Sequence, residues 1–172
     1  MVGLRRLSGS GGRTSLGVIV ILGILAATAL PKFANLGGDA RVASLNAARG
    51  SLNSVAAMTH GRYLANTSGT PLPAIDLEGT SVAMDTTTGY PNASKLLATA
   101  AGITAADYLV LDTPGSATTT QPGVLANQIV IVPNSVVGTP AALKCNLVYT
   151  AGTTASLPAP TIVVAAAKGD DC

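Results

Sequence analysis

The spacing of the hydrophobic residues changes near residue 31, and it predicts one helix with two unlike halves. Residues 16–30 are uncharged and almost wholly aliphatic or alanine, so apolar side chains would cover every side of a helix formed there. Beyond Lys32, apolar residues recur every three or four positions, which predicts an amphipathic continuation. We therefore expect an N-terminal helix over residues 16–65, apolar all round at 16–30 and amphipathic at 32–65.

Glycine and proline should interrupt this helix. Gly23 and Pro31 mark the expected helix break, because glycine costs about 1 kcal/mol relative to alanine and proline removes one backbone hydrogen bond. The pair Gly37-Gly38 should loosen the helix a second time. The amphipathic half carries two apolar sets, which are Phe33, Leu36, Ala40, Ala43 and Ala47, and Leu45, Leu52, Val55, Ala56 and Met58.

The remainder of the chain predicts a leader and a β-rich head, within a length that suits one ordinary domain and a short appendage. Residues 1–15 are basic and rich in glycine and serine, so we expect a flexible leader there. Residues 66–172 alternate short apolar runs with turn-forming residues, which predicts a globular head. The expected elements are strands at 81–84, 108–111, 128–132, 143–150 and 161–166, a helix at 92–101 capped by Asn92 or Ser94, and one helical turn at 104–107.

Charge is sparse and unevenly distributed. Charged residues make up 10% of the chain and the formal net charge is +2, which excludes a nucleic-acid binder that needs many phosphate contacts. Seven of the ten basic residues lie in the first 62 positions, and seven of the eight acids lie after residue 75. A basic N-terminal third suits a membrane-proximal segment, and a solvated basic helix face explains it equally well.

Two cysteines, Cys145 and Cys172, both lie in the last thirty residues. A single pair in a chain that starts with an export-like segment predicts one disulfide in an oxidising compartment.

Three interpretations compete for the apolar segment. It fits a cleaved signal peptide, since Arg5 and Arg6 precede an apolar core and residues 27–29 form an A-x-A site, which would leave a secreted binding domain starting at Leu30. It fits a globular core helix poorly, because a head of about a hundred residues could not surround it. The third interpretation is that the segment stays on the finished protein and is buried among identical copies.

A family resemblance favours the third interpretation. The run VIVILGILAATALPKFANLGGDARVASLNAARGSLNSV, residues 18–55, resembles the N-terminal helix of a type IV pilin. The stretch ILGILAATALPKF followed by DAR is most similar to the mannose-sensitive haemagglutinin (MSHA) type pilin family. The loop bounded by Cys145 and Cys172 also resembles the disulfide-bounded region of that family, whereas the middle of the chain does not.

The resemblance implies a fold and an assembly. The fold would be α+β, with a long protruding N-terminal helix packed on a small antiparallel sheet and a C-terminal disulfide loop. The protein would be the major subunit of a homo-oligomeric helical filament that mediates attachment, with a minor pilin or a type II secretion pseudopilin as the alternative. Filament-core packing would fall to Val18, Ile19, Val20, Ile21, Leu22, Ile24, Leu25, Leu30 and Phe33.

The same resemblance implies a path to the cell surface. The subunit would wait in the inner membrane, meet the pilus assembly machinery, and end in an extracellular surface filament. The family's processing site falls on Gly9 and Ser10, where the family has a glycine followed by an aromatic residue. Its glutamate position falls on Thr14 in this chain.

The sequence offers few candidates for catalytic or metal-binding residues. The sole histidine, His60, has no cysteine or acid at metal-ligand spacing, so we expect a structural or solvated role. No nucleophile elbow, phosphate-binding loop or dinucleotide motif occurs. Asp170 and Asp171 could contribute to a calcium site, but exposed terminal acids explain them better. We therefore expect no catalytic residues, no metal, no cofactor and no nucleic-acid partner.

Overall fold

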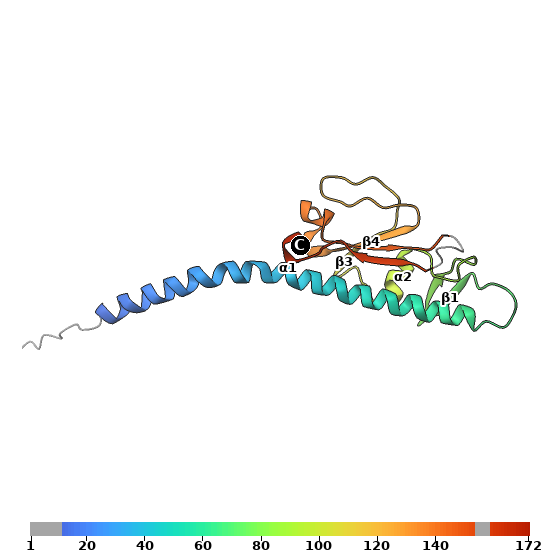
Figure 1. The fold of residues 1–172 in the computed structure, drawn as a ribbon, viewed down its shortest axis with the longest axis horizontal. Helices are drawn as coiled ribbons and strands as arrows, with labels where there is room; N and C mark the ends of the chain where they lie inside the picture. The colour runs from blue at the N-terminus through green and yellow to red at the C-terminus, as the bar shows by residue number, and fades with distance from the viewer. Residues whose placement is uncertain (1–11, 154–158) are drawn as a thin grey trace, which may run out of the picture. The chain divides into compact units, whose positions relative to one another are not determined.

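The computed structural model describes residues 12–153 and 159–172, without the side chains of residues 12–16 and 28–35. The chain divides into two units, Met1–Leu36 and Gly37–Cys172. Mixed helix and antiparallel sheet make the fold α+β (Figure 1). The elements are α1 (Gly12–Leu64), β1 (Ala74–Leu77), β2 (Thr80–Ala83), α2 (Lys95–Ala100), β3 (Tyr108–Leu111), β4 (Gln128–Pro133), β5 (Leu147–Thr150) and β6 (Thr161–Val164), with short 3-10 turns at Asn134–Val136, Pro140–Leu143 and Gly169–Asp171.

Helix α1 contributes to both units and is longer than the sequence predicts. It starts at Gly12, inside the expected leader, and ends at Leu64, one residue before the expected end. The chain is helical at Gly23 and Pro31, so the expected break is absent from this single chain. A proline deletes one backbone donor, and the neighbouring hydrogen bonds can carry the helix past it. Opening of this span inside a filament stays a prediction.

In the second unit, a four-stranded antiparallel sheet has the order β3-β4-β5-β6, and the later part of α1 runs along it (Figure 1). The register pairs Val110 with Ile131, Ile131 with Leu147, and Leu147 with Val164, so these four residues share one face. Tyr108 lies on the same face and its hydroxyl reaches Ser44 on α1, which identifies this as the face that packs against the helix.

Strand β4 forms the centre of the core because both of its faces are covered. Ile129 and Ile131 on the helix side are fully buried, and Val130 and Val132 on the other side are 1% exposed. The far face is covered by Pro122, Val137 and Ala142, which lie beside the side chains of Leu109 and Val132. A strand that is buried on two faces needs a continuous apolar run. This is why residues 129–132 are all apolar instead of alternating between apolar and polar side chains.

The buried side of α1 confirms one of the two apolar sets and overturns the other. Leu45, Leu52, Val55 and Ala56 are buried, as expected, but Met58 is 56% exposed. Of the other set, Leu36, Ala40, Ala43 and Ala47 are all exposed. A helix lying on a sheet buries one stripe about 100° wide, and only the set centred on Leu52 faces the sheet.

Most head elements lie where the sequence predicts, with small shifts. Ser94 caps α2, and its hydroxyl accepts a hydrogen bond from the Leu97 amide at 3.3 Å. The strand expected at 143–150 is confined to Leu147–Thr150, because a 3-10 turn occupies Pro140–Leu143. Residues 104–107 form a hydrogen-bonded turn rather than a helical segment.

The sequence missed the β1–β2 hairpin, of which only the second strand was expected. Glu78 and Gly79 at its tip have φ angles of 51° and 83°, as both central residues of a type I′ turn must. That turn usually carries Asn-Gly or Asp-Gly, so the Glu78-Gly79 pair does not match the sequence pattern that predicts a hairpin.

Candidate functional site

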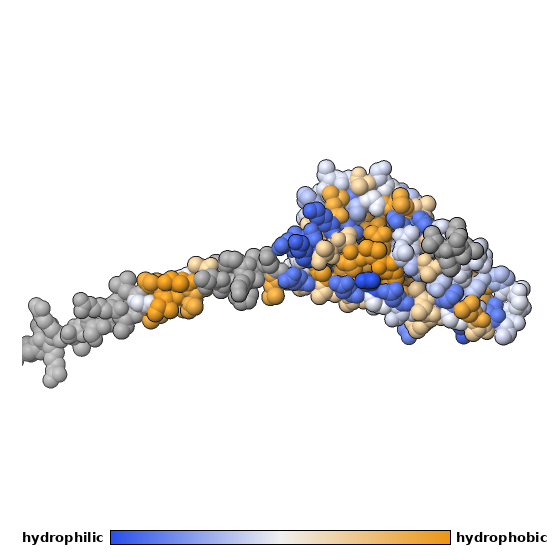
Figure 2. All heavy atoms as spheres, viewed as in Figure 1, coloured by the Kyte–Doolittle hydropathy of each residue, from blue (hydrophilic) through white to orange (hydrophobic). Residues whose placement is uncertain are grey.

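The described part of the first unit presents a band of exposed apolar side chains on α1. Val18, Ile19, Val20, Ile21, Leu22, Ile24 and Leu25 are between 55% and 66% exposed. Five consecutive residues of a helix point in five directions about 100° apart, so no single side is polar. Figure 2 shows this band as a continuous apolar surface. Apolar surface of this extent marks a place that other molecules cover.

Part of the expected assembly site cannot be placed. Gly9 and Ser10 lie outside the described residues, as do the side chains of Leu30, Pro31 and Phe33. Within the described parts of the chain, none of the helices meets the combined demands of length and hydropathy for spanning a bilayer.

The disulfide between Cys145 and Cys172 is confirmed. The Cα atoms of the two cysteines are 4.8 Å apart, and the bridge closes a loop with a sequence separation of 27. Cys145 is fully buried in the core, so the C-terminal segment is anchored to the sheet and its connections. Constraining a loop of this size in the unfolded chain stabilises the fold by about 3.5 kcal/mol.

The C-terminal segment is also held against α1. Gly38 and Gly169 approach so closely that a Cβ atom on Gly38 would overlap the Gly169 carbonyl group. Three residues further along the helix, the Arg41 guanidinium donates a hydrogen bond to the main-chain oxygen of Cys172 at 2.7 Å. Sequence reasoning took Gly37-Gly38 as a weak point of the helix, but in the fold Gly38 is a contact point. Only the tertiary neighbour reveals that role.

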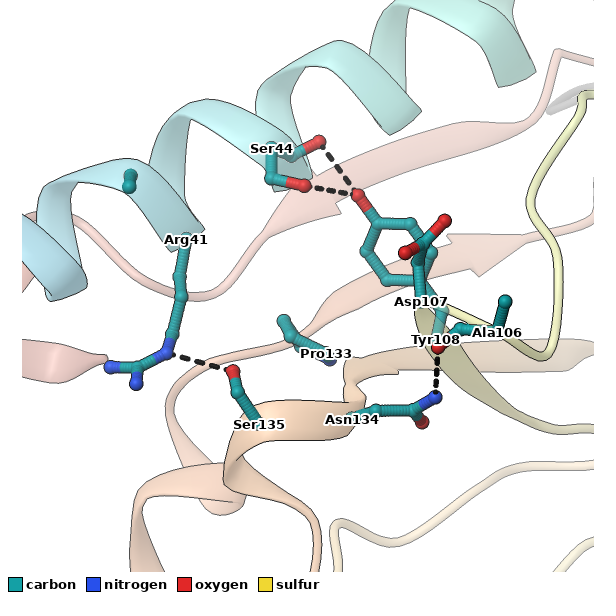
Figure 3. A pocket seen from close by; sticks show the side chains of 9 residues that line it. Arg41, Ser44, Ala106, Asp107, Tyr108, Pro133, Asn134 and Ser135 are labelled. Atoms are coloured by element: carbon teal, nitrogen blue, oxygen red, sulfur yellow. Dashed lines mark hydrogen bonds between the residues drawn. The ribbon is translucent and has the colours of Figure 1, made fainter.

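An open pocket of about 470 Å³ lies beside Arg41 in the second unit (Figure 3). The Arg41 guanidinium donates through Nε to the Ser135 hydroxyl at 2.8 Å. The Tyr108 hydroxyl donates to the Ser44 main-chain oxygen at 3.3 Å and also contacts the Ser44 hydroxyl. The Asn134 side chain donates to the main-chain oxygens of residues 105 and 106, at 2.9 Å each. These bonds join α1 to the start of β3 and the end of β4.

The charged and polar groups of the pocket differ in how far they are paired. Among the described residues, the Asp107 carboxylate has no hydrogen-bond or ion-pair partner, whereas the Arg41 guanidinium already makes two hydrogen bonds. The residues that line the pocket include neither histidine nor cysteine. The hydrogen bonds across the pocket hold α1 on the sheet.

His60 has a structural environment. Its ring stacks on Tyr90 with the ring centroids 3.8 Å apart. Nδ1 lies 2.8 Å from the Gly89 carbonyl oxygen, and a carbonyl can only accept, so Nδ1 is the donor in this contact. Within the part of the chain that the structure describes, no group of three or more His, Cys, Asp or Glu side chains could hold a metal ion.

Two acidic groups in the head have shifted pKa values. The main-chain amide of Thr88 donates to Asp85 at 2.9 Å and lowers the pKa of that carboxyl, and the Thr87 amide adds to the effect at 2.7 Å. Burial raises the pKa of the Tyr149 hydroxyl far above its ordinary value, and Tyr90 adds to the shift. The Tyr149 hydroxyl donates to the Pro91 carbonyl at 2.7 Å, which satisfies it in the core.

No family model, curated protein or solved structure matches this chain.

Proposed function

We propose that this protein is the major structural subunit of a type IV pilus-like surface filament that mediates attachment. The observation that carries the proposal is the apolar band at residues 18–25, which is exposed in all directions around α1. One flat partner can cover one side of a helix, whereas a bundle of identical helices covers all sides. The resemblance of residues 18–55 to type IV pilin helices supports the same assembly.

The physical route to the filament follows from the side chains. In lipid a helix satisfies its own backbone hydrogen bonds, and in a filament the same aliphatic side chains exchange acyl chains for those of neighbouring copies. The transfer therefore changes the hydrophobic free energy little. Gly23, Ala26 and Ala27 leave room for neighbouring helices to approach closely. Under this proposal the subunit waits in the inner membrane, is handed to the pilus assembly machinery, and ends in an extracellular filament.

The disulfide in the head supports an extracellular destination, because disulfides persist in oxidising environments. The proposal includes no catalysis and no cofactor. A minor pilin or a type II secretion pseudopilin is the related alternative, and abundance separates them. A major subunit dominates the sheared surface fraction of the cell, whereas a minor subunit does not.

The experiment is electron microscopy of sheared surface material from cells that express the full chain. We expect filaments that contain this protein, and their loss in the variant Leu22→Asp, because a carboxylate among packed aliphatic helices would be buried without a partner. The matched control is Leu125→Asp, which changes a similarly exposed leucine in the head (64% against 58% exposed) and should leave filaments intact.

The N-terminus of the mature protein gives an independent readout. An end near Ser10, or an uncut chain within filaments, supports the proposal. A mature protein that begins at Leu30 and stays monomeric would overturn it in favour of a secreted binding domain, since residues 27–29 match a signal-peptidase site.

A further inference from the structure

The tip of the β1–β2 hairpin carries an acid that the turn itself does not favour. Glu78 has a φ of 51°, a left-handed conformation in which asparagine or glycine is easier to accommodate. Its side chain is exposed, and no described residue forms an ion pair or a hydrogen bond with its carboxylate. Asp76 makes the local turn contact instead, accepting a hydrogen bond from the Gly79 amide at 3.0 Å. The Glu78 charge is therefore available to a partner.

A depression lined by both polar and apolar side chains includes this acid in its wall. It measures about 260 Å³ and is lined by Met58, Leu77, Glu78, Thr80, Thr99 and Ala100. Met58 is 56% exposed, whereas its helix neighbours Val55 and Ala56 are buried. Flexible methionine side chains adapt to the shape of a partner. The hairpin tip and the depression together form what we term the acidic surface.

A basic surface lies on the other side of α1. Arg49 is exposed, and among the described residues its guanidinium has no acidic partner. The amides of Asn46 and Asn53 fold back onto the main-chain oxygens of Val42 and Arg49, at 3.0 Å each. These neighbours do not compete for an incoming carboxylate, so Arg49 stands alone on its side of the helix.

The two surfaces face away from each other on the same unit. Met58 follows Arg49 by nine residues, which is about two and a half turns of α-helix and places them on opposite sides of α1. One molecule therefore presents both halves of a complementary pair without being able to join them. A contact between unlike surfaces of identical molecules repeats and gives an open chain unless its rotation closes a ring.

From this arrangement we infer that Glu78 of one copy pairs with Arg49 of the next copy, with the Met58 depression receiving the helix face around Arg49. The inference rests on the proposed filament and adds to it a specific contact between the hairpin tip of one copy and helix α1 of the next. The basic N-terminal third and the acidic remainder of the sequence then complement each other between copies. Across such an interface, matched charges fix the register and like charges oppose association.

Chemical cross-linking tests the contact directly. In the variant Arg49→Lys, a carbodiimide can join the new amine to a nearby carboxylate without a spacer. We expect mass spectrometry of sheared filaments to find a peptide that links position 49 to Glu78 between two chains. Because the pair is exposed, the yield of this product should fall as salt is added before the reagent. The wild-type chain is the matched control, because a guanidinium does not form the amide and position 49 should then give no link to Glu78.

Charge reversal tests whether the contact matters for assembly. Arg49→Glu and Glu78→Arg should each reduce the yield of sheared filaments about tenfold or more, since like charges across an interface oppose association strongly. The double variant Arg49→Glu/Glu78→Arg should restore the yield. Lys144→Glu and Asp107→Arg reverse exposed charges elsewhere on the second unit and should leave the yield unchanged.

Glu78→Asn removes the negative charge but keeps the turn, because asparagine suits the left-handed position better than glutamate does. This variant should fold at least as well as the wild type and still lose filament yield. Wild-type filaments with unchanged yield in all the charge variants would overturn this contact and leave the filament proposal standing. A wild-type chain that forms no filaments would overturn both.

Discussion

Two stretches of α1 place similar side chains in opposite environments. Between residues 18 and 25 the aliphatic side chains are more than half exposed, whereas Leu45 and Leu52 are completely buried. Both stretches are helical and both are rich in aliphatic residues and alanine. What separates them is the arrangement of those residues around the helix.

The difference shows what one chain can and cannot bury by itself. An amphipathic stretch needs one apolar neighbour, and the four-stranded sheet of the second unit supplies it. A stretch that is apolar all round needs neighbours on every side, and the side chains of residues 18–22 are 55–66% exposed in this single chain. The proposed filament would supply such neighbours from other copies of the chain.

Shortening one leucine side chain in each stretch should give the largest difference in stability between them. Leu52→Ala should lower the free energy of unfolding by about 2–5 kcal/mol, because it leaves a cavity in the core. The matched variant Leu22→Ala should change it by no more than about 0.5 kcal/mol, because that side chain is already exposed. Urea unfolding followed by tyrosine fluorescence measures both. Equal losses would show that the first stretch is packed within the single chain.

Removing the disulfide should have the next largest effect, and only on the head. Cys172→Ser should cost about 3.5 kcal/mol through loop entropy and should also reduce filament yield. Thermal unfolding of the variant and of the reduced wild type should agree. Unchanged melting and unchanged filament yield would contradict a stabilising role for the bridge.

Two adjacent glycines at the start of the second unit, Gly37 and Gly38, should respond differently to an added methyl group. Gly38→Ala should destabilise the head by about 1–3 kcal/mol, because the added methyl group overlaps Gly169. Gly37→Ala is the control, since open space surrounds that position and alanine favours helix. Circular dichroism melting distinguishes them, and equal melting temperatures would exclude the close contact.

The smallest expected effect is a pH dependence confined to the head. The folded state lowers the pKa of Asp85, so this carboxylate stabilises the fold above its unfolded pKa of about 4. That stabilisation should be lost as the pH falls through the lower folded value. Asp85→Asn should flatten the stability profile in this acid range. Parallel profiles for Asp85→Asn and the wild type would contradict the assignment.

Local patterns of the sequence were enough to predict most helices and strands of the head. Strand β3 was expected at its observed bounds, and β4 and β6 within two residues, because their apolar runs are bounded by turn residues. The Ser94 cap and the disulfide were also expected from the sequence. The hairpin at Glu78 was not, since its turn lacks the usual residues.

By itself, the sequence determined that the chain has an apolar segment too uniform for its own core, an amphipathic helix after it, and a disulfide-bonded β-rich head. Only the tertiary structure decided which apolar set of α1 faces the sheet, why Gly38 has no side chain, and which charges remain without partners. Spacing along a helix is a local property, and the sequence therefore records it. Close approach and charge pairing depend on residues as far apart as Arg41 and Cys172, and only folding brings these together.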